Sequence, residues 1–84
     1  MSFLRMGTET KASPEAVIEK AVSFFGREGV GLTLVQRSTN SAYFTQAEGH
    51  VQVVATPIDD GRKTDVDVQT REWAYDVKRF MTKI

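Results

Sequence analysis

Polar and apolar side chains alternate near the start of the chain, over residues 3–10. Leu4 and Met6 fall on one side of this segment, whereas Arg5 and Glu9 fall on the other. Successive side chains of a β-strand point to opposite faces of a sheet. The alternation therefore predicts a strand whose Leu4 and Met6 side faces the core.

The pattern changes to a helical period after Ser13. Ser13 suits an N-cap, Pro14 suits the first helical position, and Glu15 suits the positive end of a helix. Gly26 and Gly29 are expected to end this helix in a left-handed turn. Apolar residues recur at spacings of three and four and give the helix a broad apolar face: Val17, Ile18, Ala21, Val22, Phe24 and Phe25.

Four short alternating segments follow, and polar turns divide them. The turns fall at residues 38–41, 48–50 and 59–61, and Asp59-Asp60-Gly61 is the strongest turn signal. Pro57 has no N–H to donate, so it is expected to end ladder pairing in the third of these segments. The segments are predicted as hairpin-linked strands with one buried face, which carries Leu32, Leu34, Ala42, Phe44, Val51, Val53, Ala55, Val66 and Val68.

The last segment returns to a helical period. Its apolar residues are Trp73, Val77, Phe80, Met81 and Ile84, and Lys78, Arg79 and Lys83 lie toward its negative end. Thr70 is a candidate cap. We expect a helix from about Arg71 to the end of the chain.

The order of these elements is β-α-β4-α. It predicts one α+β domain over residues 1–84, with an antiparallel sheet of about five strands and both helices on one face. Eighty-four residues allow one small core. The residues expected to be largely buried are Leu4, Met6, Val17, Ala21, Phe25, Leu34, Phe44, Val53, Val66, Val68, Trp73, Val77 and Phe80.

Composition narrows the function classes. Eleven basic and eleven acidic side chains cancel and are interspersed along the chain, which disfavours a nucleic-acid partner. The absence of cysteine excludes disulfides, thiolate metal sites and a Cys nucleophile, and it favours the cytoplasm. No apolar run approaches the ~20 residues of a membrane helix, so no membrane association is expected.

The candidate catalytic groups do not form a recognisable pattern. His50 is the only histidine and follows Gly49 at a predicted turn, so an exposed turn histidine is the favoured interpretation. Asp59 and Asp60 belong to a turn, and Asp65 and Asp67 share one side of a strand. The glycines of residues 26–31 follow a helix, whereas a phosphate-binding loop precedes one. We therefore predict no enzyme activity, no cofactor and no metal site.

Two surfaces remain as candidate binding sites. The sheet face away from the helices is expected to carry Phe3, Arg5, Val35, Arg37, Tyr43, Gln52 and Val54. Exposed apolar groups on it suggest a contact surface, with homodimerisation as the leading expectation. One alternative is a small apolar ligand in a groove between the last helix and the sheet, near Trp73, Tyr75, Val77 and Phe80. Another is nucleic-acid binding on the sheet face.

Over its whole length the chain resembles the helix-grip group, which includes the Bet v 1 proteins, the START domains and the polyketide cyclases. The TATA-binding protein repeat has the same element order. The resemblance rests on the first strand, on Ser13-Pro14-Glu15-Ala16-Val17 and on residues 70–80, which are similar to the C-terminal helix of the cyclase-like branch. It implies that the first strand pairs antiparallel with the strand of Val66 and Val68. Arg5 would then share a face with Asp65 and Asp67.

Overall fold

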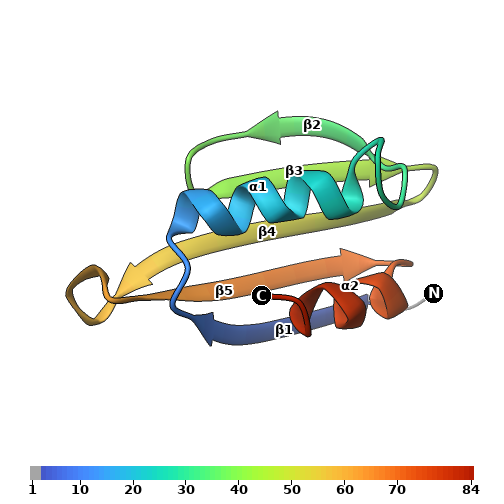
Figure 1. Ribbon diagram of the computed structural model, residues 1–84. Coiled ribbons are helices and arrows are strands. Elements are labelled where there is room, and N and C mark those ends of the chain that lie inside the picture. The colour runs from blue at the N-terminus through green and yellow to red at the C-terminus, as the bar shows by residue number, and fades with distance from the viewer. Residues whose placement is uncertain (1–2) are drawn as a thin grey trace.

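The computed structural model describes residues 3–84 as one antiparallel sheet covered by two helices (Figure 1). The chain is an α+β protein of β-α-β4-α order, as predicted. The elements are β1 (Phe3–Thr10), α1 (Pro14–Phe25), β2 (Thr33–Arg37), β3 (Ser41–Gln46), β4 (Gly49–Ile58), the short 3₁₀ turn η1 (Asp59–Gly61), β5 (Lys63–Arg71) and α2 (Ala74–Met81). Among residues 3–84, neither helix has the length and apolar character needed to cross a membrane.

The sheet order is β1-β5-β4-β3-β2, and every pairing is antiparallel. The expected pairing of β1 with β5 is confirmed, since Met6 lies opposite Val68 and Thr8 opposite Val66. Both helices cover the same face of the sheet. In Figure 1, α1 crosses β3 and β4, whereas α2 lies over β5 and β1.

The start of α1 follows its sequence signals. The Ser13 hydroxyl accepts a hydrogen bond from the Ala16 amide at 3.1 Å, and Pro14 begins the helix. The expected left-handed turn at Gly26 and Gly29 is wrong in position. Gly26 is extended, with φ of −77°, and Gly31 takes the left-handed conformation, with φ of 97°. Gly26 instead lies so close to the Val22 carbonyl oxygen that any side chain at this position would collide with it.

The last helix begins later than predicted. Arg71 is still part of β5, and α2 starts at Ala74. Thr70 does not cap the helix; its hydroxyl donates to the carbonyl oxygen of His50 at 2.7 Å and ties β5 to β4. Glu72, with φ of 78°, makes the turn between strand and helix. The apolar residues from Trp73 onward follow a helical spacing, but this spacing does not reveal where the strand before them ends. Arg71 therefore belongs to β5 and not to the helix.

Strand β4 runs through Pro57, contrary to the expectation that pairing ends there. Pro57 lies opposite Thr64, and the ladder continues to Ile58. The amide of Ala55 points toward β3, where it donates to the carbonyl oxygen of Asn40 at 2.8 Å. The ring nitrogen of Pro57 points the same way by alternation, but β3 begins only opposite Val54. The missing N–H therefore lies along a free edge of β4, where proline is tolerated.

The core lies between the helices and the covered face of the sheet. Its fully buried apolar residues are Val17, Ile18, Ala21, Phe25, Leu32, Ala42, Phe44, Val51, Val53, Ala55, Val66, Val68, Val77 and Phe80. Leu34 was expected there but is 37% exposed, because β2 is an edge strand beyond the part of the sheet that α1 crosses. Leu4, Met6 and Trp73 are only partly buried and pack against the rim of the core.

We expect Phe80→Ala to lower the free energy of unfolding by about 3–5 kcal/mol, because a buried aromatic ring would leave a cavity. Phe80 is 1% exposed and lies within 5.6 Å, between ring centres, of Phe24 and Phe25. Urea unfolding measures the change. Tyr75→Ala on the same helix is the control and should cost less than about 1 kcal/mol, since Tyr75 is 74% exposed. A loss below about 1 kcal/mol for Phe80→Ala would contradict its place in the core.

Candidate binding face of the sheet

The sheet face opposite the helices is not covered by any element of residues 3–84. We call it the open face. Strand alternation and register place its residues in rows across the sheet. The first row holds Phe3, Arg71, His50 and Thr45; the second holds Arg5, Gln69, Gln52 and Tyr43; the third holds Gly7, Asp67, Val54 and Ser41; the fourth holds Glu9, Asp65 and Thr56.

Three aromatic rings gather at one end of the open face. Phe3 is 65% exposed, and its ring centre lies 6.4 Å from that of His50. Tyr43 stacks on the other side of His50, with a centre distance of 5.9 Å and an angle of 24° between the rings. His50 is thus a half-buried strand residue between two aromatic rings. Its prediction as an exposed turn residue is wrong.

The error at His50 comes from the turn before it. The two-residue connection is Ala47-Glu48, and Gln46 already pairs with Gly49. Ala47 takes the positive φ of 51° that the turn requires. Extending the alternation of Gln52 and Val54 back by two residues would have placed His50 on the open face.

Arg5 and Asp67 form an ion pair near the middle of the open face. Arg5 Nη2 donates to Asp67 Oδ2 at 2.8 Å, and Nε donates to Oδ1 at 3.2 Å. The residue directly opposite Arg5 is Gln69, so this pair is diagonal. The hydrogen bonds, followed by the charge of Asp67, raise the pKa of Arg5. The implied pairing of Arg5 with an aspartate of β5 is confirmed.

The other end of the open face carries charged side chains. Glu9 and Asp65 lie directly opposite each other across β1 and β5. Lys63 approaches Glu9 only at 3.7 Å, with both side chains about half exposed. Like charges in direct cross-strand register are destabilising. The open face therefore changes along the strands, from aromatic rings at the Phe3 end to charged side chains at the Glu9 end.

A bulge in β2 displaces one of the predicted contact residues. Leu34 pairs with Phe44 but Gln36 pairs with Tyr43, so the register shifts at Val35. Arg37 consequently lies opposite Ala42, whose side chain is buried under the helices, and its predicted place on the open face is wrong. Gln36 takes that place. Val35, at the bulge, is 58% exposed.

The residues predicted to line a helix–sheet groove do not form one. Val77 and Phe80 are buried in the core, and Tyr75 points to solvent with the Arg79 guanidinium 5.9 Å from its ring centre. Trp73 packs over Gly49 at the end of the sheet. A methyl group at Gly49 would lie 2.5 Å from Nε1 of Trp73 and 2.7 Å from the Arg71 carbonyl oxygen.

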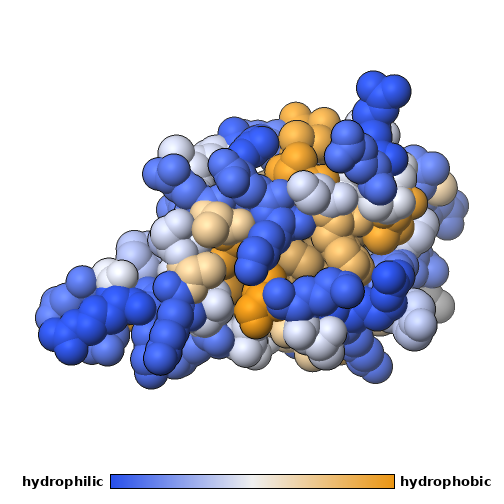
Figure 2. Space-filling model, viewed as in Figure 1, coloured by the Kyte–Doolittle hydropathy of each residue, from blue (hydrophilic) through white to orange (hydrophobic). Residues whose placement is uncertain are grey.

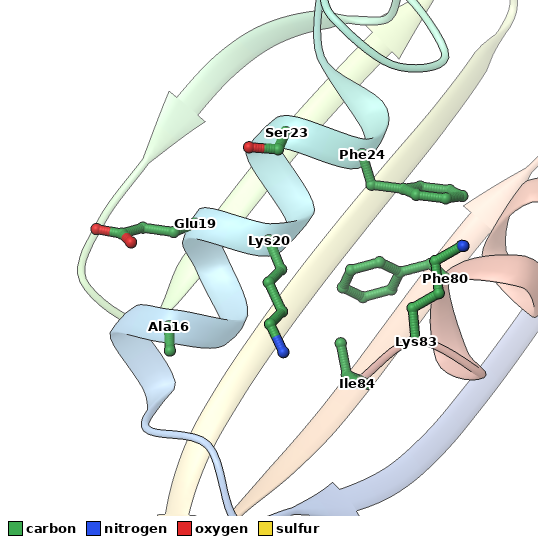
Figure 3. Close-up of a pocket in the computed structure, with 8 residues that line it drawn as sticks. All are labelled: Ala16, Glu19, Lys20, Ser23, Phe24, Phe80, Lys83 and Ile84. Atoms are coloured by element: carbon green, nitrogen blue, oxygen red, sulfur yellow. The ribbon is translucent and has the colours of Figure 1, made fainter.

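An open groove lies instead between the two helices, on the covered side of the molecule. Its volume is about 490 Å³, within the range of small-molecule sites. Figure 2 shows apolar surface in the middle of this side, surrounded by hydrophilic residues. Figure 3 draws the residues that line the groove: Ala16, Glu19, Lys20, Ser23, Phe24, Phe80, Lys83 and Ile84. No pattern in the sequence indicates this groove, because four strands separate α1 and α2 along the chain.

No protein-family model, curated protein or solved structure matches this chain.

Within residues 3–84, no three His, Asp or Glu side chains come together in a way that could hold a metal ion. The four aspartates of the predicted clusters lie apart in two settings. Asp59 and Asp60 are exposed in η1, and Asp65 and Asp67 belong to the open face.

We expect Gly49→Ala to destabilise the protein by about 1–3 kcal/mol, because the added methyl group overlaps the Trp73 ring and the Arg71 carbonyl. Gly7→Ala is the matched control in the neighbouring part of the sheet. A methyl group at Gly7 meets only the Val66 carbonyl oxygen at 3.7 Å. That substitution should be neutral or stabilising by up to about 1 kcal/mol. Thermal or urea unfolding compares the two, and equal effects would contradict the packing of Trp73 over Gly49.

Proposed function

We propose that this chain is a non-enzymatic assembly module that binds a second copy of itself through the open face. The observation that carries the proposal is the two-ended character of that face. One end carries exposed Phe3 beside the rings of His50 and Tyr43, and the other holds the charged side chains of Glu9, Asp65 and Lys63. A surface with opposite ends is complementary to its own copy when that copy is reversed.

A two-fold axis running across the strands gives this reversal. It stacks two open faces with their strand directions opposed, so the first row of one copy lies over the fourth row of the other. Phe3 then lies over Glu9 of the second copy, and Arg71 lies over Asp65. Tyr43, in the second row, lies over the third row, which supplies Val54 and Ser41.

The size of the face is sufficient for such an interface. Five strands about 4.8 Å apart and eight residues of about 3.3 Å each give a footprint of about 24 by 26 Å. Two stacked copies would therefore cover more than the roughly 1,000 Å² in total that a specific interface needs. Interfaces of this kind need no net charge on the chain, which agrees with eleven basic and eleven acidic side chains.

Nucleic-acid binding on the same face is the weaker alternative. Aromatic rings and arginines on an open sheet suit base stacking. However, Glu9, Asp65 and Asp67 lie on this face and would repel phosphates, and Asp67 already binds Arg5.

A relationship to the helix-grip group or to the TATA-binding protein repeat is likewise a proposal, supported by element order. So is a cytoplasmic location, supported by the absence of cysteine.

We expect the protein to have twice its chain mass of 9.4 kDa in solution at micromolar concentration, and Tyr43→Asp to be a folded monomer. The substitution would place an uncompensated carboxylate within the interface. Sedimentation equilibrium measures the mass, and circular dichroism verifies the fold. The matched control is Tyr75→Asp, which adds the same charge to the helix side and should leave the dimer intact.

Three outcomes would contradict the proposal. A wild-type monomer at high micromolar concentration would exclude the dimer. A dimer that survives Tyr43→Asp would place the interface elsewhere, and one that dissociates only in Tyr75→Asp would move it to the helix side. Salt-sensitive binding of single-stranded DNA by the monomer, lost in Tyr43→Asp, would favour the nucleic-acid alternative.

A further inference from the structure

The groove between α1 and α2 has an apolar floor. The rings of Phe24, from α1, and Phe80, from α2, lie 5.6 Å apart between centres. Ile84 lies beyond Phe80 along the same groove (Figure 3). Phe80 is fully buried, whereas Phe24 and Ile84 are only partly covered and keep apolar surface accessible. This floor can accept an alkyl chain or a ring without any rearrangement of the core.

Two lysines lie on opposite sides of this floor. Lys20 comes from α1 and points toward the Ile84 end of the groove, whereas Lys83 follows α2 and runs beside Phe80 with its ammonium group directed away from Lys20 (Figure 3). Neither forms an ion pair within 4.0 Å with any residue of 3–84, the C-terminal carboxylate included. Two uncompensated ammonium groups beside an apolar surface attract an anion that also carries apolar atoms.

The acidic residues near the groove do not cancel this charge. Glu19 lines the outer rim, but Figure 3 shows its side chain directed away from Phe80 and Ile84. Asp76, next to the far end of the groove, binds Arg79 at 3.2 Å. The Arg79 guanidinium also lies 5.2 Å from the Phe24 ring centre, so this arginine is held at the end of the groove.

We propose that this groove binds a free amphipathic carboxylate of medium chain length. Its alkyl chain would lie along Phe24, Phe80 and Ile84, and its carboxylate would be attracted by the lysines at the two walls, Lys20 and Lys83. A volume of about 490 Å³ fits a small ligand of this kind. The inference goes beyond the proposed dimer and is independent of it, because the groove and the open face lie on opposite sides of the sheet.

The charge pattern favours this ligand class over the others that an apolar groove could take. A neutral ligand would leave both lysines without a counter-charge, and a cationic amphiphile would be repelled by them. A second copy of the chain would bring another Lys20 and Lys83 to the same place if it docked groove to groove. A carboxylate supplies the one charge that the groove lacks.

Decanoate, below its micelle concentration, is the probe. Isothermal titration should show saturable binding to the wild-type protein. The amide signals of Ala16, Lys20, Phe24 and Ile84 should shift in nuclear magnetic resonance spectra. Decanoate should bind about two- to fourfold more tightly per added methylene relative to shorter homologues, because each buried methylene adds transfer free energy. Decanol and decyltrimethylammonium should bind more weakly than decanoate.

The double variant Lys20→Ala/Lys83→Ala should weaken decanoate binding by about tenfold, since two surface charge contacts are lost. Lys78→Ala is the control; Lys78 is exposed on α2 outside the groove, and its loss should leave the affinity unchanged. Sedimentation equilibrium on the same samples measures the mass of the protein. Loss of the dimer can then be told apart from loss of decanoate binding.

Several results would overturn the site. They are no saturable binding of decanoate at millimolar concentration, amide shifts confined to the open face, or equal loss of affinity in Lys78→Ala and in the double variant. Equal affinity for decanoate and decanol would refute the role of the lysines. Binding to phosphatidylglycerol vesicles without binding of free decanoate would show that the helix side contacts membrane surfaces instead.

Discussion

Phe25 holds the three parts of this small protein together. Its ring lies 5.1 Å from that of Phe80 in α2 and 5.6 Å from that of Phe44 in β3, measured between centres. Aromatic contacts of this kind add about 0.5–1.5 kcal/mol each beyond the burial of their surface. Because Phe25 belongs to α1 and is fully buried, it fixes both helices against the same side of the sheet. The sheet and the two helices therefore share one core, which leaves the other sheet face open.

The same constraint produces both candidate sites. Apolar side chains are concentrated on the covered side, so the open face is left with amides, charges and a few rings, ordered by strand register. On the covered side, α1 lies over β3 and β4 while α2 lies over β5 and β1 (Figure 1). The groove lies where the two helices separate at the surface, above the contact between Phe24 and Phe80. A chain of 84 residues buries a limited share of its surface. The groove is therefore lined by apolar surface that the core leaves accessible.

Alternation and helical period predicted much of the fold, because both reflect which side of an element is buried. Val66 and Val68, Phe44 and Val77 were all assigned correctly on this basis. The element order, the sheet with both helices on one face, and the Ser13 cap followed from sequence as well. Errors occurred where neighbours outside the local pattern decide the outcome. Pro57 is tolerated because β3 has already ended, and Leu34 is partly exposed because β2 is the edge strand of the sheet.

The candidate sites were harder to predict for the same reason. One extra residue in β2 moved Arg37 to the covered side, and no periodicity in five residues reveals such a bulge. His50 joined the aromatic end of the open face because a two-residue hairpin placed Gly49 inside β4 rather than in the turn. Lys20 and Lys83 lie 63 positions apart in sequence and line one groove only because Phe25 and Phe80 bring the two helices together. Zero net charge conceals this local arrangement, since the acidic side chains that balance these lysines lie elsewhere on the protein. The positions of individual charged side chains therefore indicate more about the function of this protein than its net charge does.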